Sequence, residues 1–374
     1  MLRLARLTLR EIDLPLKEPF QTASGIATKR RILLLHLKDI NGIESWSECV
    51  AGSYPNYSPE TIDTAWFAIK EWIAPKVLGR EFQMPDEIHP ILERDIRGHL
   101  MAKAAVEMGM WELAAQIQGK SLSKFLGGTK TKIATGISLG IQKSPQVLIE
   151  KIQQALKLGY QRVKIKIKPG ADVEYLAAVR AAVGGEASLT VDANCAYSLE
   201  DIEHLRQLDQ FNLKMIEQPL AWDDLVQHAV LQKEIKTPIC LDESINTLAK
   251  TKEMVALASG RIVNIKPGRV GGFTSSIGIH DYCKQNDIPV WCGGMLESGI
   301  GRAYNVALAS LQNFVLPGDI SPSSRYWQQD IVTPEWTMDS DGMVTVPLER
   351  TGIGVDVNQD RIENLTIRRE TLKK

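Results

Sequence analysis

The chain has 374 residues, of which 44% are apolar and 24% are charged, so it can build the core of a soluble globular protein with one to three domains. A formal net charge of −1 gives no reason to expect nucleic acid or an anionic membrane as a partner. No apolar run approaches the roughly 20 residues of a membrane span, and the N-terminal segment lacks the apolar block of a signal peptide. The five cysteines form no CxxC pair, which predicts reduced cysteines in a cytoplasmic protein.

The N-terminal region carries the signals of antiparallel strands. Its first 16 residues, MLRLARLTLREIDLPL, alternate apolar and charged side chains as an extended strand does. The segment RILLLHLKDINGIESWSECV (31–50) predicts a hairpin that turns at Asn41-Gly42, because this dipeptide favours the tight turn between paired strands.

The middle of the chain alternates short apolar strands with helical patterns. Helical periodicity occurs in SPQVLIEKIQQALKLG and YSLEDIEHLRQLDQ, for example. Eight strands alternating with helices predict parallel βα units closed into a barrel. An open doubly wound sheet is the rival fold, but it needs a glycine-rich phosphate turn after its first strand, and SLGIQKS is not one. The strand candidates are 133–141, 162–168, 188–194, 213–219, 238–244, 261–268, 288–294 and 314–320.

Charged residues recur at the ends of five of these strands. They are Lys166, Asp192, Glu217, Asp242 and Lys266, and the steps between them are 26, 25, 25 and 24 residues. One βα unit of this length returns the chain to the same height on the neighbouring strand. We therefore expect the five side chains to meet at the C-terminal mouth of the barrel, where barrel enzymes hold their active sites.

The strand VKIKIKPG (163–170) carries lysines at every second position, which places them on one face. Such lysines can protect an edge strand from aggregation. The barrel spacing favours a different interpretation, in which this is the second barrel strand and Lys164 and Lys166 face the lumen.

Three carboxylates that converge in a barrel mouth repel one another unless a cation lies among them. Oxygen ligands with open positions suit Mg²⁺, for which Mn²⁺ can substitute, and all six histidines lie away from these strand ends. A divalent ion acidifies the α-proton of a carboxylate substrate by stabilising the enediolate. The lysine that takes this proton must be neutral, so the ordinary lysine pKa of about 10.4 must fall by several units. A Schiff-base aldolase also uses a lysine but needs no such carboxylates.

These motifs resemble the enolase superfamily, and within it the muconate-lactonizing subgroup, over nearly the whole chain. VKIKIKPG is similar to its K-x-K strand, which implies that Lys166 is the acid/base and that Lys164 tunes it. VDAN, IEQPL and LDES resemble its three metal-ligand strand ends, which implies that Asp192, Glu217 and Asp242 bind the metal. NIKPGRVGG is similar to the segment that supplies the lysine of the opposite face, here Lys266.

The resemblance implies a modified TIM barrel of the (β/α)7β type with an α+β capping domain. Residues 1–127 would form the cap, whose three strands and helices are completed by the tail 326–374, and residues 128–325 would form the barrel. The segment 102–128 resembles the helix that leads from the cap into the barrel. The loop AGSYPNYSPET (51–61) lies where the family has its specificity loop.

The segment 292–331 resembles the o-succinylbenzoate synthases of the menaquinone pathway and the related N-succinylamino acid racemases. The first family implies dehydration of 2-succinyl-6-hydroxy-2,4-cyclohexadiene-1-carboxylate, the second racemisation from opposite faces, and one site can serve both. A catalytically silent barrel is disfavoured because it needs no paired lysines. The resemblance also implies a homo-oligomer and a substrate-binding set of Ser138, Asn194, Tyr57, Gly293 and Met295. Glu297 is expected to be a structural partner of Arg302 or Arg325.

Overall fold

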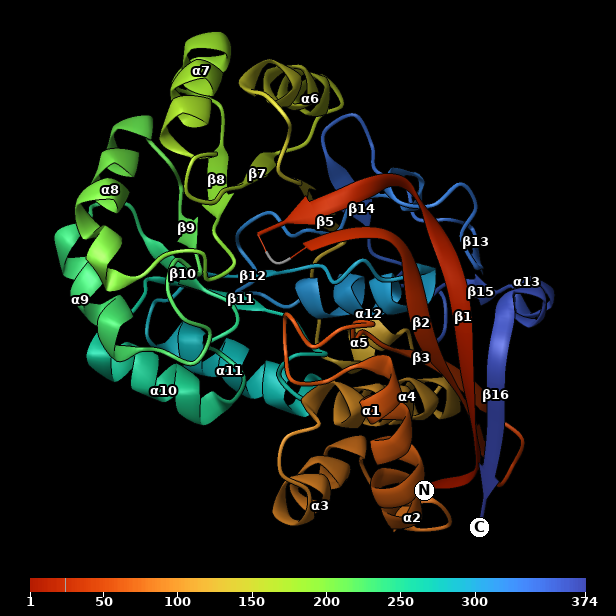
Figure 1. Ribbon diagram of the computed structural model, residues 1–374. Helices are drawn as coiled ribbons and strands as arrows, with labels where there is room; N and C mark the ends of the chain where they lie inside the picture. Colours follow the sequence, from red (N-terminus) through yellow and green to blue (C-terminus); the bar gives the residue numbers. More distant parts are fainter. Residues whose placement is uncertain (24) are drawn as a thin grey trace.

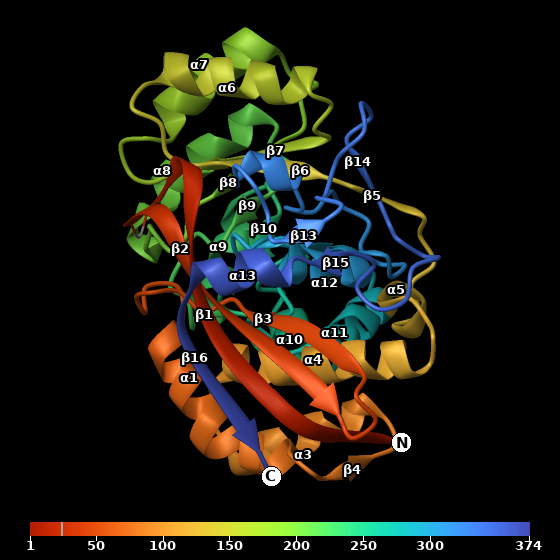
Figure 2. The ribbon, with the colours of Figure 1, turned by 90° about the vertical axis from the view of Figure 1, so that its right-hand side faces the viewer.

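The computed structural model describes residues 1–23 and 25–374 and contains an antiparallel sheet with its own helices beside a parallel barrel sheet (Figures 1 and 2). The antiparallel sheet has the strand order β16-β1-β2-β3, and β4 pairs with the start of β1. The predicted hairpin is present as β2 and β3, with the turn at Asn41-Gly42. The strands are β1 (Leu2–Thr22), β2 (Gly25–Asp39), β3 (Glu44–Cys49), β4 (Glu81–Phe82) and β16 (Thr366–Lys373).

The strand β2 has buried side chains on both faces. Ile32 and Leu34 belong to the large core shared with the barrel, whereas Leu33, Leu35 and Leu37 pack with the helices of the cap. Because neighbouring residues of a strand point to opposite faces, an uninterrupted apolar run is what a strand between two cores requires. The helices of the cap are α1 (Ile62–Ala68), the π-helical η1 (Ile69–Ile73), α2 (Ala74–Val77), α3 (Ile88–Asp95), α4 (Leu100–Ile117) and α5 (Leu122–Phe125).

The parallel sheet has seven strands in sequential order, from β6 to β12. Its strands are β6 (Gly136–Leu139), β7 (Arg162–Lys166), β8 (Leu189–Asp192), β9 (Ile216–Glu217), β10 (Ile239–Leu241), β11 (Ile262–Ile265) and β12 (Val290–Cys292). The helices that follow them are α6 (Pro145–Lys157), α7 (Val173–Val183), α8 (Ile202–Arg206), α9 (Val226–Glu234), α10 (Leu248–Leu257), α11 (Phe273–Gln285) and α12 (Gly299–Ala309). The predicted barrel with an α+β cap is confirmed.

The predicted eighth strand, 314–320, was wrong as a regular element. This segment instead makes isolated bridges, Phe314 with Val290 and Gly318 with Thr135. Asp319 N donates to Cys292 O at 2.9 Å, and Gly136 N donates to Gly318 O at 2.7 Å. The segment therefore closes the barrel between β12 and β6 without forming a continuous ladder.

The C-terminal tail returns to the cap and also covers part of the barrel. The strand β16 pairs antiparallel with β1, from Arg6 opposite Lys373 to Ile12 opposite Thr366. Before it, β5 (Lys132–Ala134) pairs with β14 (Met343–Thr345), β13 (Val332–Thr333) pairs with β15 (Asp356–Val357), and α13 is Gln359–Leu365. Within the described ranges, no helix has the length and apolar character needed to cross a membrane.

Candidate active site

The five charged residues of the predicted mouth lie at the ends of neighbouring strands. Lys166, Asp192 and Glu217 are the last residues of β7, β8 and β9, and they are paired in register across the sheet. Asp242 and Lys266 directly follow β10 and β11. All five side chains are buried, and the structure brings them together at one end of the barrel, as their sequence spacing requires.

Two of the three carboxylates, Asp192 and Glu217, share a pattern of contacts. In Asp192 and Glu217 one oxygen accepts from an amide: Asp192 Oδ1 from Asn194 N at 3.0 Å, and Glu217 Oε1 from Asn264 Nδ2 at 2.7 Å. The other oxygen of each faces a lysine: Lys166 Nζ lies 2.6 Å from Asp192 Oδ2, and Lys164 Nζ lies 2.9 Å from Glu217 Oε2. Both of these carboxylates are therefore held by an amide on one side and meet a cation on the other.

Asp242 is held by the cap as well as by the barrel. The Tyr57 hydroxyl donates to Asp242 Oδ1 at 2.9 Å, and the Arg269 guanidinium contacts the same oxygen. Lys266 Nζ lies 2.7 Å from Asp242 Oδ2 and 3.1 Å from the Tyr57 oxygen. A residue of the predicted specificity loop thus touches both a strand-end carboxylate and the opposite-face lysine.

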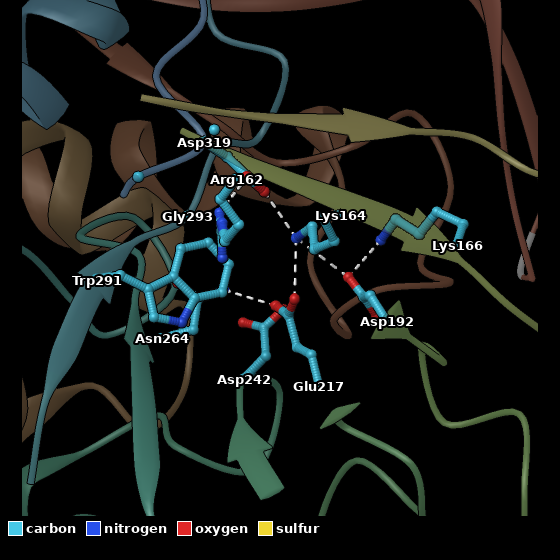
Figure 3. A network of polar contacts seen from close by, with 12 residues as sticks. Arg162, Lys164, Lys166, Asp192, Glu217, Asp242, Asn264, Trp291, Gly293 and Asp319 are labelled. Carbon is cyan, nitrogen blue, oxygen red and sulfur yellow. Dashed lines mark hydrogen bonds and ion pairs between the residues drawn. The ribbon is translucent and has the colours of Figure 1, made fainter. Parts of the chain in front are cut away.

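Lys164 lies at the centre of a buried ion-pair network (Figure 3). Its Nζ is 2.7 Å from Asp319 Oδ2, 2.9 Å from Glu217 Oε2 and 3.2 Å from Asp192 Oδ2. Arg162 donates to the other oxygen of Asp319 at 2.6 Å and lies over the Trp291 ring at 4.0 Å from its centroid. Lys164 is therefore fixed on several sides, which suits a residue that acts by its charge rather than by its motion.

The electrostatics of the site keep Lys164 and Lys266 charged. Burial lowers the pKa of Lys164, but the charges of Asp319, Glu217 and Asp192 hold it above the ordinary lysine value. Burial opposes a charge on Lys266 in the same way, but Tyr57, Glu217 and Glu243 raise its pKa overall. A further positive charge among the carboxylates would lower the pKa of a neighbouring lysine, so that the lysine could lose its proton and act as a base.

The carboxylates offer a fitting donor set for a divalent cation. Among residues 1–23 and 25–374, no three His, Cys, Asp or Glu side chains are grouped as metal ligands, and Asp192, Glu217 and Asp242 each contact a lysine instead. The donors are nonetheless oxygens only, which hard ions prefer. Beside them Glu243 Oε2 is buried and has no hydrogen-bond partner in the described chain, and burial followed by the charge of Asp192 raises the pKa of Glu243 to about 7. An unpaired carboxylate oxygen at this place fits a cation.

A cavity of about 420 Å³ opens above the two lysines. Lys166 and Lys266 line it from the barrel, and the hairpin of β1 and β2 and the loop after β3 cover it from the cap. Of the predicted substrate-binding residues, Tyr57, Asn194 and Met295 line this cavity. The volume is in the range of small-molecule sites.

The other two predicted substrate-binding residues lie deeper. Ser138 on β6 is in register with Lys164, and its buried Oγ has no hydrogen-bond partner in the described part of the chain. Gly293 packs against Lys266 and Asn264, and a Cβ there would lie 2.6 Å from Lys266 Cε. Ser138 is therefore the neighbour of Lys164 in the sheet, and Gly293 leaves the space that Lys266 occupies.

In the part of the chain that the structure describes, no arginine pairs with the carboxylate of Glu297. Glu297 Oε1 accepts from Met295 N and from Asn305 Nδ2, both at 2.8 Å. Arg302 does bind Glu297, but it donates to the main-chain oxygen, at 3.0 Å. Glu297 thus fixes the turn that carries Met295.

Sequence reasoning missed several buried partners of this site. Asn264 lies two residues before Lys266, and Arg162 lies two residues before Lys164, so the alternation of a strand places them on the same faces. Asp319 stands near the end of the expected eighth strand and could have been found by the strand-end rule. Arg269 lies in a loop, and no sequence signal indicated its contact with Asp242.

The fold and the site together define a barrel enzyme whose buried lysines and carboxylates lie beneath a capping domain. Residues 5–127 match the mandelate racemase / muconate lactonizing enzyme N-terminal domain family, and residues 147–361 match the enolase C-terminal domain-like family. The chain therefore belongs to the enolase superfamily, as the resemblance of its motifs predicted. Enzymes of this superfamily generally depend on a divalent metal ion and act on small molecules.

The chain is similar to characterised proteins over nearly its whole length. It is 46% identical over 360 residues to an o-succinylbenzoate synthase from Bacillus subtilis (strain 168), covering 96% of each chain. It is 44% identical to an N-succinylamino acid racemase from Thermus thermophilus, covering 98% of each chain. A solved member of the enolase superfamily from Listeria innocua superposes with a TM-score of 0.96 at 40% identity and covers all of both chains.

Proposed function

We propose that this protein dehydrates 2-succinyl-6-hydroxy-2,4-cyclohexadiene-1-carboxylate to o-succinylbenzoate in menaquinone biosynthesis. The observation that carries the proposal is that Lys166 and Lys266 line one cavity from β7 and β11, each paired with a strand-end carboxylate. The similarity to an o-succinylbenzoate synthase over 96% of the chain supports this reaction. Racemisation of N-succinylamino acids is the second candidate, and the similarity to a racemase over 98% of the chain supports it.

In the dehydration, Lys166 removes the α-proton of the substrate and then returns it to the departing hydroxyl on the same face, so that water leaves. Lys266 stays protonated and stabilises the negative charge that develops on the substrate carboxylate. Lys164 holds Asp192 and Glu217 in place and tunes Lys166. Asn194, which accepts from Lys166 Nζ through its Oδ1 at 2.6 Å, orients this base.

We propose Mg²⁺ as the metal, with Mn²⁺ as a substitute, held by Asp192, Glu217 and Asp242. When bound, it would supply the positive charge that makes the α-proton acidic and stabilises the enediolate. Tyr57, Asn194 and Met295 would contact the substrate directly, while Ser138 and Gly293 would support the site from below.

Three further proposals complete this assignment. Residues 1–127 together with 326–374 form the capping domain, which the pairing of β16 with β1 supports, and residues 128–325 form the barrel. The substrate is a small carboxylate with a succinyl group, and the net charge of −1 gives no reason to expect nucleic acid or a membrane as a partner. Homo-oligomeric assembly and a cytoplasmic location stay predictions from the sequence.

Removal of the metal tests the cofactor. We expect excess chelator to abolish both dehydration and racemisation, and added Mg²⁺ or Mn²⁺ to restore them. Asp242→Asn should weaken metal binding, measured by calorimetry, while the circular dichroism spectrum stays that of the folded barrel. Full activity in excess chelator would contradict the proposed mechanism.

The variant Lys266→Arg separates the two candidate reactions. Dehydration requires a positive charge on this side, whereas racemisation requires a proton to be delivered to carbon from it. Arginine keeps the charge but cannot exchange protons near neutral pH. We expect the variant to lose racemisation almost completely and to retain measurable o-succinylbenzoate formation, reduced by the poorer fit of a larger head beside Gly293. Wild-type protein that racemises but forms no o-succinylbenzoate would make racemisation the function.

A further inference from the structure

The cavity above the lysines is lined by more positive than negative side chains. Its described lining contains four cations, Lys29, Arg30, Lys166 and Lys266, and one carboxylate, Glu60. Glu60 is already engaged, because its two oxygens accept from Met101 N and Ala102 N at the start of α4. The lining therefore has an excess of positive charge, and the cations that are not already paired within the protein are available to an anionic ligand.

Three of the four cations have a carboxylate partner within the protein. Lys166 lies 2.6 Å from Asp192, Lys266 lies 2.7 Å from Asp242, and Lys29 lies 2.6 Å from Asp13. These cations need no ligand to balance their charge.

Arg30 differs from the other three cations. Its side chain is 9% exposed, yet within the described ranges it makes no ion pair, and its one side-chain hydrogen bond runs from Nη2 to Val50 O at 3.0 Å. Its Nε is buried and has no partner in that part of the chain. A guanidinium is always charged, and a charge that is buried without a counter-ion costs free energy. The position of Arg30 in the wall of the cavity suggests that an anionic ligand offsets this cost.

The carboxylates nearest to Arg30 in the cap and the barrel are committed elsewhere. Glu48 Oε2 accepts from Ser298 Oγ at 2.6 Å and from Gly301 N at 3.1 Å, at the N-terminus of α12. Glu297 Oε1 accepts from Met295 N and Asn305 Nδ2. Both acids act on Arg30 through their charge at a distance. They do not fill its hydrogen-bonding positions.

We propose that Arg30 binds the second carboxylate of a dicarboxylate substrate, and so makes the site selective for succinyl over neutral acyl groups. The inference rests on the proposed function, because it assumes that the reacting carboxylate lies beside Lys166 and Lys266. With that end fixed, the terminal carboxylate of a succinyl arm reaches the cap side of the same cavity, where Arg30 and Met295 form part of the wall. Arginine offers parallel N–H donors to such a group.

The test compares two substrates that differ only in the carboxymethyl group at the end of the succinyl arm, which carries this carboxylate. N-succinylphenylalanine and N-acetylphenylalanine are followed by α-proton exchange in deuterated solvent with the Mg²⁺-loaded wild type and with Arg30→Met. We expect the wild type to prefer the succinyl substrate and the variant to lose kcat/KM for it by about 10- to 100-fold, mainly through KM. Exchange of the acetyl substrate should change less than about threefold, because Arg30 has no partner on it.

Two further variants make the test specific. Lys29→Met removes a neighbouring positive charge that is already paired with Asp13, and we expect it to leave the ratio between the two substrates unchanged. Arg30→Lys keeps the charge, and we expect it to retain part of the succinyl preference even if Arg30→Met folds poorly. Calorimetric binding of the two substrates should show the same loss, independently of turnover.

The outcomes separate this inference from the proposed function. An equal loss for both substrates in Arg30→Met and Arg30→Lys would overturn the inference and make Arg30 a structural counter-charge to Glu48 and Glu297. A wild type without any succinyl preference would overturn it as well. A wild type that exchanges neither substrate would instead contradict the proposed function, and the binding measurements would then decide the role of Arg30.

Discussion

At Gly293 the backbone passes so close to Lys266 that no side chain fits between them. A Cβ at this position would lie 2.4 Å from Asn264 Oδ1 and 2.6 Å from both Asn264 Nδ2 and Lys266 Cε. Asn264 in turn orients Glu217, so one glycine leaves space for Lys266 on one side and for the amide that holds Glu217 on the other. The absence of a side chain is thus a requirement of the site.

We expect Gly293→Ala to displace Lys266 and to lower activity by at least about 100-fold, because misplacement of a catalytic group by 1 Å has effects of this size. The overpacking should also destabilise the protein by about 1–3 kcal/mol. Activity and thermal unfolding are measured together. Gly278→Ala on α11 is the control, since its Cβ would meet Leu248 Cδ2 at an ordinary 3.6 Å. Wild-type activity in Gly293→Ala would show that Lys266 has room to move.

Sequence predicted the charged residues of the site better than their partners. Lys166, Asp192 and Glu217 were found because the length of a βα unit repeats along the chain, and this repeat is a local property. Asn264 has the same kind of signal, two residues before Lys266, and was overlooked. Arg30 meets the site only through the folding of the cap onto the barrel, and no spacing in the sequence expresses that contact.

Among the elements, α4 joins the two parts of the molecule. It is buried on all sides, as a helix between a sheet and a barrel must be. The Glu107 side chain on α4 accepts from Phe273 N at 2.8 Å and from Thr274 N at 2.9 Å, which are the first amides of α11. A carboxylate of the capping domain therefore binds the N-terminus of a barrel helix. Both the free amides and the helix dipole favour negative charge at that place.

Glu107→Ala should leave these amides buried without an acceptor. We expect a loss of about 2–4 kcal/mol in the free energy of unfolding, since each unsatisfied buried donor costs about 1–3 kcal/mol. Chemical denaturation measures it, with Glu253→Ala as the control. Glu253 is an exposed acid paired with Lys250 on α10, and its loss should cost less than about 0.5 kcal/mol. Equal stability of Glu107→Ala and wild type would show that water replaces the carboxylate.

The closing segment 314–320 shows why one element escaped prediction. Its apolar run, FVLPGDI, has the composition of a buried strand. Pro317 has no N–H to donate to a ladder, and Gly318 instead pairs alone with Thr135. Composition therefore predicted the position of the segment in the barrel, and the proline prevented its regular pairing.

Across the whole molecule, several acids are buried at or near the junction of cap, barrel and C-terminal tail. Burial is the main cause that raises the pKa of Glu48, Glu107 and Glu112 to about 7 in each case. The folded state therefore binds protons at these positions between about pH 4.5 and pH 7, where the unfolded chain has released them. Their contribution to stability is complete below about pH 4.5 and is lost as the pH rises to about 7.

Glu112→Gln isolates this dependence. Glu112 Oε1 accepts from Gln116 Nε2 at 2.9 Å and from Ile353 N at 3.2 Å, and a glutamine keeps that oxygen without the titration. We expect the stability of the variant relative to wild type to increase by up to about 3 kcal/mol between pH 5 and pH 8. Thermal unfolding at several pH values measures it. Glu349→Gln, at an exposed acid, is the control, and a difference between Glu112→Gln and wild type that does not vary with pH would contradict the raised pKa of Glu112.

The antiparallel pairing of β1 with β16 brings both chain ends to the same end of the cap sheet (Figures 1 and 2). Phe20 and Thr22, near the other end of β1, line the cavity, and the 17 residues from Arg6 to Thr22 span roughly 50 Å of strand. A short linker can therefore join the two termini. The chain can be reopened in an exposed loop such as the one at Gly184 and Gly185, where a Cβ would meet nothing within 4 Å. A circular permutant of this kind could carry a fused reporter or an immobilisation tag on the barrel side while the mouth stays open to substrate.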